Sequence, residues 1–374
     1  MTVNVILIVN SGSSSLKVSV FEAAADLPLL ASGRITGIGA RSEFSWNGNS
    51  IQEIPGMLDH AGALREFLSW MERCSESWRL QAVGHRIVHG GEKYSAPAIL
   101  TSQVLKELEA LIPLAPLHQP NCLAAVYAIA ESHPDLLQIG CFDTAFHKYH
   151  APIFQHYAIP KFLRDQGIRR YGFHGLSYEW VAHELVKQHP HVAEGRVVAA
   201  HLGSGASLCA MLACKSIDTT MGMTTLDGLP MGTRCGSIDP GAVLYMMREL
   251  NLEIDRVEQI LSSDSGLVGL SGISHDVQEL LASKSEEARF AIHYFCTMTA
   301  QHIARMAVSI GGLDALVFTG GIGENVEPVR TQIKERLSFL MPFEELVIPA
   351  NEERIIAEHS WSLYQERLKS QRQR

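Results

Sequence analysis

A short polar stretch near the amino terminus combines residue types that can bind a small anion. It follows the apolar run Val5-Ile6-Leu7-Ile8 and reads Ser-Gly-Ser-Ser-Ser over residues 11–15, with a single cation, Lys17, close behind. The backbone N–H groups and hydroxyls of such a turn can donate hydrogen bonds to phosphate oxygens. The same composition is typical of an ordinary hairpin turn, so this stretch alone leaves both interpretations open.

A second stretch, half a chain further on, repeats this pattern. Residues 5–20 (VILIVNSGSSSLKVSV) and residues 196–211 (RVVAAHLGSGASLCAM) each consist of an apolar strand, a turn of small residues and a second apolar strand. Each predicts a β-hairpin whose Gly- and Ser-containing turn lets an anion approach without a Cβ clash. The repeat is typical of a duplicated α/β domain; two coincidental glycine-rich hairpins are the alternative.

Four further clusters place charged or titratable side chains beside glycines or at strand ends. They are GHRIVHGGEKY with Arg86, RRYGFHGLS with His174, DGLPMGTRCGSIDPG with Arg234, and CFDTAFHKYH with Asp143. Each residue alone could be a capping or packing residue. Because ligands of α/β proteins bind at the carboxyl ends of strands, we interpret the four clusters together as one site.

Two arginines, a histidine, a lysine and two glycine hairpins suit the chemistry of a transferring phosphoryl group. Together they can neutralise the charge spread over its oxygens, with Arg as a planar fork and Lys as a point charge. Carboxylates such as Asp143 and Glu352 are the oxygen ligands that Mg²⁺ prefers. The glycines of FTGGIGENV, residues 318–326, permit close backbone approach, although the segment is not a Walker loop. We expect its Glu324 and Asn325 to cap a following helix.

The composition excludes several classes of protein. With 374 residues, 46% hydrophobic and 19% charged, the chain is typical of a globular protein long enough for two domains. A net charge of -9 argues against a nucleic-acid or membrane-surface binder. The seven cysteines form no C-x-x-C pair, which favours reduced thiols over zinc. The sequence shows neither a signal peptide nor an apolar run long enough to span a membrane, so we expect a cytoplasmic protein.

Strand-like and helical patterns alternate along the chain, which indicates α/β layers. We expect strands at Val5–Asn10, Val83–Ile87, Gln138–Phe142, Val197–His201 and Ala315–Thr319. We expect a helix over Thr101–Leu111 and a long, largely buried helix over Glu287–Ile310, with Phe290, Tyr294 and Met298 among its core residues and an end at Gly311. The polar segment Gln365–Arg374 is expected to fray at the surface.

The motifs, taken in order, resemble those of the acetate kinase family, within the sugar kinase–Hsp70–actin superfamily. The matching segments are VNSGSSSLK, GHRIVHGGE, LAPLHQPN, FDTAFH, RRYGFHG, DTTMGMTTLDGLPMGTRCGSIDPG, FTGGIGEN and VIPANEE, and they cover the chain almost end to end. The resemblance implies an α/β fold of two duplicated actin/Hsp70-like (ribonuclease H-like) domains with a central cleft. It assigns residues 1–146, completed by residues 354–374, to an acyl- and phosphate-binding domain, and residues 147–353 to a nucleotide-binding domain.

The resemblance also implies roles for individual residues. The catalytic set would be Arg86, Asp143, His174, Arg234 and His118. Phosphate and nucleotide contacts would come from Ser13, Ser15, Lys17, His201, Leu202, Gly203, Ser204, Gly205, Asp276, Val277, Gln278, Gly321, Ile322, Gly323, Glu324 and Asn325. Besides Arg86, the acetate pocket would contain Val88, Leu117, Phe173 and Thr225. Asn10 and Glu352 would be associated with Mg²⁺ or Mn²⁺, with the adjacent Glu353 as the alternative to Glu352.

Several positions depart from the family pattern. Ser204 stands where HLGNG has Asn, Gln278 where an arginine is usual, Thr225 where the pocket has proline, and Tyr178 where GFHGTSH has histidine. The segment before VIPANEE is also shorter than usual. These changes bear on nucleotide affinity and acyl preference, because Arg86, Asp143, His174 and Arg234 are retained.

The resemblance implies reversible phosphoryl transfer from ATP to acetate, giving acetyl phosphate and ADP, by a homodimer that serves acetyl-CoA biosynthesis. A carboxylate nucleophile is already ionised at neutral pH, so Asp143 is expected to position groups rather than accept a proton. The alternatives are a propionate or broad short-chain acyl kinase, a butyrate kinase, pyrophosphate as donor, a nucleotide-binding regulator without turnover and, least supported, a sugar kinase. The long helix over Glu287–Ile310 could pack against a partner chain or belong to the core.

Overall fold

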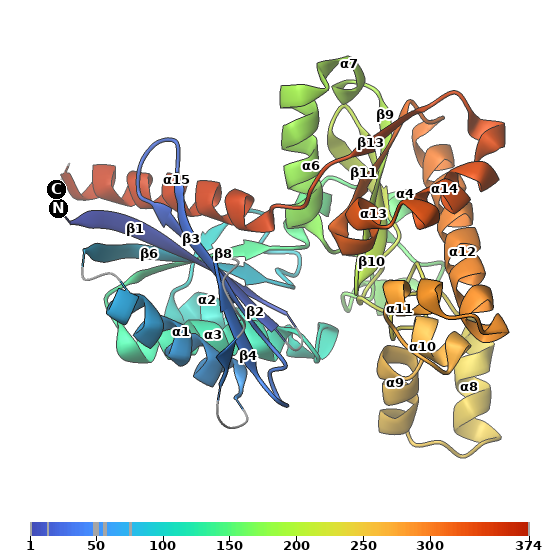
Figure 1. The fold of residues 1–374 in the computed structure, drawn as a ribbon, viewed down its shortest axis with the longest axis horizontal. Coiled ribbons are helices and arrows are strands. Elements are labelled where there is room, and N and C mark those ends of the chain that lie inside the picture. Colours follow the sequence, from blue (N-terminus) through green and yellow to red (C-terminus); the bar gives the residue numbers. More distant parts are fainter. Residues whose placement is uncertain (1, 13–14, 48–51, 55–57, 75–76, 373–374) are drawn as a thin grey trace. The chain divides into compact units, whose positions relative to one another are not determined.

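The chain folds into two compact α/β units, each built around its own sheet. The computed structural model describes residues 2–12, 15–47, 52–54, 58–74 and 77–372. The first unit comprises residues 1–145 and 351–374, and the second comprises residues 146–350. Figure 1 shows the elements of each unit.

The first unit contains an eight-stranded sheet in the order β5-β4-β3-β2-β1-β6-β8-β7. Its strands are β1 Val3–Ser11, β2 Ser15–Glu22, β3 Leu29–Thr36, β4 Glu43–Trp46, β5 Gln52–Glu53, β6 Trp78–Ile87, β7 Ala98–Ile99 and β8 Leu137–Phe142. Its helices are α1 His60–Cys74, α2 Ser102–Glu109, α3 Gln119–Ser132 and α15 Glu352–Arg372, with a 3₁₀ turn at Ile112–Leu114.

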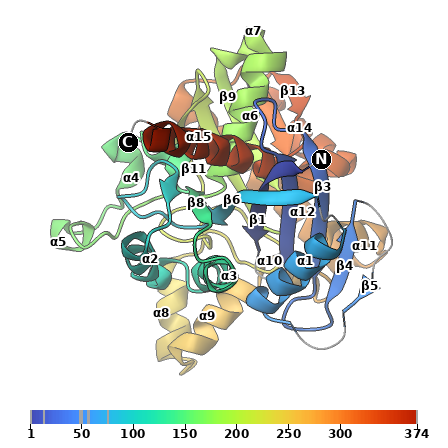
Figure 2. The ribbon, with the colours of Figure 1, turned by 90° about the vertical axis from the view of Figure 1, so that its left-hand side faces the viewer.

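Helices cover both faces of this sheet, which explains why β1 is a continuous apolar run. Val5, Leu7 and Val9 join the core cluster that includes residues of α1 and α3. Helix α15 packs against the opposite face, along β1 and β6 (Figure 2). Gly84 permits this approach, because a Cβ there would overlap Ser360 of α15.

The second unit contains a five-stranded sheet in the order β11-β10-β9-β12-β13. Its strands are β9 Arg196–Leu202, β10 Ala206–Leu212, β11 Lys215–Thr219, β12 Ala315–Thr319 and β13 Glu344–Val347. Its helices are α4 Pro152–Gln155, α5 Lys161–Arg164, α6 Gly175–Gln188, α7 Pro190–Ala193, α8 Pro240–Arg248, α9 Ile254–Ser263, α10 Gly266–Ser271, α11 Val277–Ala282, α12 Glu286–Ile310, α13 Gly320–Asn325 and α14 Glu327–Arg336. Short 3₁₀ turns occupy Ala145–His147 and Ser338–Leu340.

The two sheets share one topology. In the first, β1 pairs antiparallel with β2 and parallel with β6, and β6 pairs parallel with β8. In the second, β9 pairs antiparallel with β10 and parallel with β12, and β12 pairs parallel with β13. Both predicted hairpins, β1–β2 and β9–β10, are present, and the expected duplicated α/β fold is confirmed.

The long helix α12 forms where the sequence predicts it. Ser285 caps its first turn by accepting a hydrogen bond from the Ala288 N–H, and Gly311, at φ 76°, ends it in the left-handed conformation. The prediction of which residues of α12 are buried is partly wrong, because Phe290 is 55% exposed and smaller residues such as Ala291 face the core instead. Helix α2 also matches its prediction, with Thr101 as the N-cap.

The carboxyl-terminal segment corrects another expectation. The polar residues from Gln365 belong to α15, which continues as a helix to Arg372, rather than fraying. Ile355, Ile356 and Ala357 anchor its first turns on the sheet, and its acidic first turn and basic last turn complement the helix dipole. Among the described residues, every helix is too short or too polar to cross a membrane.

Candidate active site

In the first unit, three neighbouring parallel strands bring polar side chains to one edge of the sheet. Asn10 lies near the end of β1, Arg86 near the end of β6, and Asp143 directly after β8. Because these strands run parallel, their carboxyl ends meet at the same edge. Glu352 and Glu353, in the first turn of α15, reach the same place through their contacts with Asn10.

Arg86 and Asp143 form a bidentate ion pair. The Arg86 Nε donates to Asp143 Oδ1 at 3.0 Å, and Nη2 donates to Oδ2 at 2.6 Å. The side chains are 17% and 1% exposed. Burial by itself lowers the pKa of Arg86. The negative charges of Asp143 and Glu352 outweigh this effect, so the pKa is raised above its ordinary value and the guanidinium is cationic. Asp143 therefore acts as the anchor that orients Arg86.

The amide of Asn10 joins Arg86 to the acidic start of α15. Its Nδ2 donates to Glu352 Oε2 at 3.0 Å and to Glu353 Oε1 at 2.9 Å, and its Oδ1 accepts from Arg86 Nη1 at 3.4 Å. Both carboxylates thus lie within reach of one amide, and the geometry does not favour Glu352 over Glu353. Their oxygens are suitable ligands for a hard cation such as Mg²⁺.

The amino-terminal turn lies beside this cluster. Lys17 is directly opposite Asn10 in the β1–β2 register, and its side chain is exposed. Ser15 begins β2, and its carbonyl accepts a hydrogen bond from the Gly12 N–H at 2.8 Å. His60, at the start of α1, contacts the Gly12 carbonyl at 2.8 Å and so holds the turn. The predicted site residue Ser13 lies outside the described residues.

In the second unit, His174 has an unusual backbone conformation. It has φ 57° and ψ 23°, in the left-handed region, and immediately precedes α6. The His147 Nε2 lies 2.9 Å from the Phe173 carbonyl oxygen, and a Cβ at Gly172, φ 83°, would clash with the His147 ring. Left-handed conformations of non-glycine residues cost energy and occur often at functional sites.

The glycine turn of the second hairpin joins His174 to Arg234. A methyl group added at Gly205 would lie 3.3 Å from His174 Nε2 and 3.7 Å from Arg234 Nη1. The His174 ring also stacks on His201, with ring centroids 4.4 Å apart. Two basic side chains thus flank a turn without a Cβ, which is an arrangement suited to an anion.

The backbones of Gly321 and Gly232 approach the same turn. A methyl group at Gly203 would lie 3.8 Å from the Gly321 backbone nitrogen, and one at Gly232 would lie 3.7 Å from the Ser204 carbonyl oxygen. Asp276 caps α11 by accepting from the Gln278 and Glu279 N–H groups. The side chains of Leu202 and Val277 belong to the core instead.

The loop after β12 corrects one expectation. Glu324 and Asn325 do not cap a following helix, because both belong to α13 itself. Glu324 Oε1 accepts from the backbone N–H of Gly320, at the start of the same helix, and from that of Ala350. Glu324 therefore fixes the glycine turn, and α14 begins without a side-chain cap.

The proposed acetate-pocket residues differ in exposure. Val88 is buried in the first unit, whereas Leu117 is 47% exposed. His118 follows Leu117 at the N-cap position of α3. In the second unit, Phe173 is buried and the Thr225 carbonyl accepts a hydrogen bond from Arg234 Nη1 at 3.3 Å.

Three contacts around His174 were not predicted from the sequence. Ser207 contacts His174, Tyr178 contacts Ser207, and His147 contacts the Phe173 carbonyl. Two of these residues had a signal in the sequence, because Ser207 lies in the second glycine hairpin and Tyr178 lies one helical turn after His174. Their hydrogen-bond partners, however, depend on tertiary packing.

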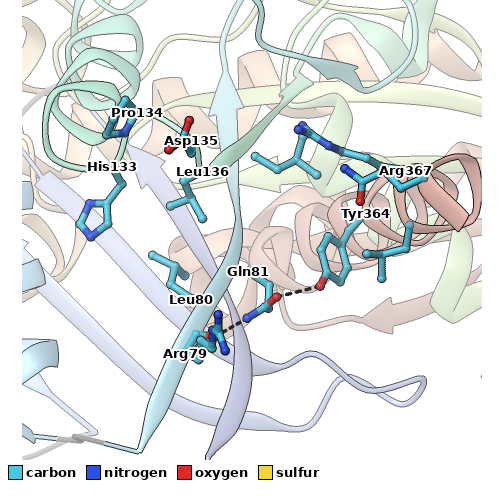
Figure 3. Close-up of a pocket in the computed structure, with 12 residues that line it drawn as sticks. Arg79, Leu80, Gln81, His133, Pro134, Asp135, Leu136, Tyr364 and Arg367 are labelled. Atoms are coloured by element: carbon cyan, nitrogen blue, oxygen red, sulfur yellow. Dashed lines mark hydrogen bonds between the residues drawn. The ribbon is translucent and has the colours of Figure 1, made fainter. Parts of the chain in front are cut away.

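A groove of about 510 Å³ in the first unit lies away from these residues. It is lined by Arg79 and Gln81 at the start of β6, the segment 133–137 and the end of α15, where Tyr364 donates to Gln81 (Figure 3). Arg86 lies at the opposite end of β6. The groove contains none of the predicted site residues.

Comparisons with known proteins support the resemblance drawn from the motifs. A family model described as the acetokinase family matches residues 5–346. The acetate kinase of Rhodopseudomonas palustris strain TIE-1 is 42% identical over 391 residues, covering 96% of this chain and 98% of that protein. The crystal structure of Porphyromonas gingivalis acetate kinase superposes with a TM-score of 0.84 at 32% identity, over 96% of this chain and 99% of the other. A propionate kinase from Francisella tularensis has a TM-score of 0.88 at 32% identity, over 97% and 100% of the two chains.

Proposed function

The chain belongs to the acetokinase family and is an enzyme of the acetate kinase class, and we propose that it reversibly transfers the γ-phosphoryl group of ATP to acetate. An acetate oxygen attacks the γ-phosphorus, the bond from that phosphorus to the β,γ-bridging oxygen breaks, and acetyl phosphate and ADP leave. The nucleophile needs no general base, because acetate is ionised at neutral pH. The observation that carries the proposal is the pair of basic side chains, His174 and Arg234, beside the Gly205 turn.

In this proposal, the first unit binds the acyl group and the metal-linked phosphate. Arg86, oriented by Asp143, binds the acetate carboxylate with the guanidinium edge that faces Asn10. Val88 and Leu117 of this unit contact the acyl group, and His118, Ser13, Ser15 and Lys17 assist at the phosphate. The resemblance also assigns Phe173 and Thr225, of the second unit, to acetate. The resemblance limits this domain to residues 1–146 and 354–374, whereas the compact unit spans residues 1–145 and 351–374 and so also contains Glu352 and Glu353.

The carboxylate oxygens of Glu352 and Glu353 suit a magnesium or manganese ion, and the Asn10 amide would add its oxygen only after turning over, because its nitrogen faces the carboxylates and its oxygen faces Arg86. Such an ion supplies positive charge to the phosphate oxygens when it is bound. Within the described ranges, no three His, Cys, Asp or Glu side chains gather closely enough to form a site by themselves. This suits Mg²⁺, which typically uses one or two carboxylates together with waters and substrate phosphates.

The nucleotide domain in this proposal is the second unit, residues 146–350, for which the resemblance implies the limits 147–353. His174 and Arg234 stabilise the transferring group, and the backbone of His201–Gly205 contacts the phosphates. Asp276, Gln278 and the segment Gly321–Asn325 surround the nucleoside. The glycine turns support this arrangement, because a phosphate or ribose can approach their backbone closely.

A propionate kinase activity is the second candidate. The Francisella tularensis propionate kinase superposes as well as the acetate kinases do. One methylene in a pocket changes binding by only about 1–3 kcal/mol, so propionate is expected as a secondary substrate. Buried Val88 favours acetate by limiting the pocket.

Acyl phosphate trapped with hydroxylamine tests these assignments. The protein is incubated with Mg²⁺, either ATP or pyrophosphate, and acetate, propionate or butyrate. We expect turnover to be fastest with acetate and ATP. Faster turnover with propionate would make the chain a propionate kinase, and no product from any pair in a protein that still binds ATP would overturn the proposed reaction.

We also propose a cytoplasmic homodimer, with a role in acetyl-CoA biosynthesis through acetyl phosphate. The surface that supports the dimer is α8, where Leu244, Tyr245 and Met247 are exposed. Helix α12 is less suitable, because most of its apolar residues already belong to the core. Leu244→Asp should convert the dimer to monomer in light scattering, while the control Val308→Asp, on the exposed face of α12, should not. A wild-type monomer at all concentrations would refute the dimer.

A further inference from the structure

Ser207 of β10 connects a buried tyrosine to His174. Its Oγ lies 2.8 Å from His174 Nδ1 and 2.5 Å from the Tyr178 hydroxyl. Tyr178 lies in α6, one turn after His174, and both Tyr178 and Ser207 are 0% exposed. The three side chains form a chain of hydrogen bonds that begins inside the second unit and ends on the His174 ring.

The protons in this chain can be assigned from chemistry. Burial, and to a lesser extent Cys209, holds the pKa of the Tyr178 phenol well above its ordinary value, so the hydroxyl keeps its proton. A buried hydroxyl must donate that proton to a partner, and Ser207 Oγ is within reach. Ser207 then donates its own proton to His174 Nδ1, which leaves the ring hydrogen on Nε2.

His201 shows the same arrangement beside the same turn. Its Nδ1 lies 2.8 Å from Ser177 Oγ, and its ring stacks on that of His174. The two Nε2 atoms lie near the hairpin glycines: a methyl group added at Gly205 would lie 3.3 Å from that of His174, and one added at Gly203 would lie 3.9 Å from that of His201. A serine thus lies at the Nδ1 of each ring, and the Nε2 of each ring lies on the side of the hairpin glycines.

We propose that Tyr178 is a positioning residue for phosphoryl transfer, which through Ser207 holds His174 in one orientation and one tautomer, with Nε2–H directed to the Gly205 turn. The inference rests on the proposed function, in which His174 contacts the transferring group. A fixed N–H donor stabilises developing charge without reorganising during the reaction. The left-handed backbone of His174 limits its ring position, and the Ser207 contact sets the rotation and the proton.

Steady-state kinetics of five variants test the inference. We expect Tyr178→Phe to lower kcat for acetyl phosphate formation about 3- to 10-fold, the range for one lost hydrogen bond, with KM for acetate and ATP unchanged. Ser207→Ala should lower kcat at least as much. In a His174→Gln background, Tyr178→Phe should have no further effect. Tyr364→Phe is the matched control and should keep wild-type kcat, because it also removes one tyrosine hydroxyl contact, to Gln81, but in the first unit.

The tautomer provides a readout that a purely structural role would not change. In protein labelled with ¹⁵N-histidine, the His174 signals, identified by their absence in His174→Gln, should show a protonated Nε2 in the wild type. Ser207→Ala and Tyr178→Phe should give a mixture of tautomers. Multiplicative losses of kcat in the double variant, or a wild-type kcat in Tyr178→Phe, would overturn the relay. A wild-type kcat in His174→Gln alone would instead refute the role proposed for His174.

Discussion

Replacing Asp143 by Asn tests whether this carboxylate positions Arg86 or accepts a proton. Asn is nearly isosteric, but it removes the negative charge and one of the two acceptor oxygens that hold Nε and Nη2. The ion pair is almost inaccessible to solvent, so screening by water is weak.

The size of the effect follows from these contacts. A hydrogen bond to a charged group contributes about 1.5–3 kcal/mol, which corresponds to a change of about 10- to 150-fold in rate. Misplacing a substrate-binding group by about 1 Å has a similar cost. We therefore expect kcat/KM for acetate to fall about 100-fold in Asp143→Asn. Breaking a buried pair also lowers the free energy of unfolding, by about 3 kcal/mol.

The assay is hydroxylamine-trapped acetyl phosphate measured from pH 5.5 to 9, together with urea unfolding. Asp165→Asn is the control, because it breaks an exposed i,i+4 pair with Lys161 and should change unfolding by less than about 1 kcal/mol. A positioning role predicts that the residual activity keeps the wild-type pH profile. Loss of an acidic limb in the variant would show a general base, and a kcat/KM within threefold of wild type would refute the proposed function of the Arg86–Asp143 pair.

Three further predictions concern stability and the nucleotide. Burial lowers the pKa of His147 from 6.5 to about 4, so the unfolded chain binds the proton more tightly than the folded chain does. The neutral, buried His147 therefore contributes about 3 kcal/mol at most to the free energy of unfolding, and this contribution is complete above pH 6.5 and is lost as the pH falls toward 4. His147→Gln should therefore flatten the dependence of unfolding free energy on pH between 6.5 and 4, and an unchanged slope would contradict this. A methyl group at Gly321 would meet no atom within 4 Å beyond its chain neighbours and the backbone of its own helix, so Gly321→Ala should keep the wild-type melting temperature. The variant should bind ATP more weakly in calorimetry, and an unchanged affinity would place the nucleotide elsewhere. Ser285→Ala should lower the free energy of unfolding by about 1 kcal/mol in urea titrations through loss of the α12 cap, and a loss below about 0.3 kcal/mol would show that the cap is dispensable.

The elements that carry the site could be predicted because they depend on local patterns. The continuous apolar run of β1 reflects burial on both faces, and the strand β12 has the predicted bounds Ala315–Thr319. Residues such as Asn10, Arg86 and Asp143 follow from strand ends, since parallel strands bring their carboxyl ends together. The Gly205 turn follows from the hairpin pattern.

The remaining features depend on contacts between distant segments. The sequence does not show that Ser207 joins Tyr178 to His174, because that contact requires β10 and α6 to pack at one distance. Helical spacing alone predicts Phe290 as a core residue, but the buried face of α12 is rotated toward Ala291. The Glu324 carboxylate accepts a hydrogen bond from the first residue of its own helix and does not cap the following helix, and the local sequence does not distinguish these two contacts.

Acetyl phosphate formation by Arg86→Ala and Arg234→Ala tests the central claim most directly, because one arginine comes from each unit. Arg79→Ala, at the opposite end of β6 from Arg86, is the matched control. With ATP, acetate and Mg²⁺, we predict that the wild type and Arg79→Ala form hydroxamate at equal rates. Both active-site variants should lose at least about 100-fold in kcat/KM. Arg234→Ala should retain the wild-type unfolding transition, whereas Arg86→Ala leaves Asp143 without its buried partner and should unfold with a free energy about 3 kcal/mol lower while remaining folded in the assay. Wild-type rates in either variant would contradict the assignment of these arginines to the transferring group and its acceptor.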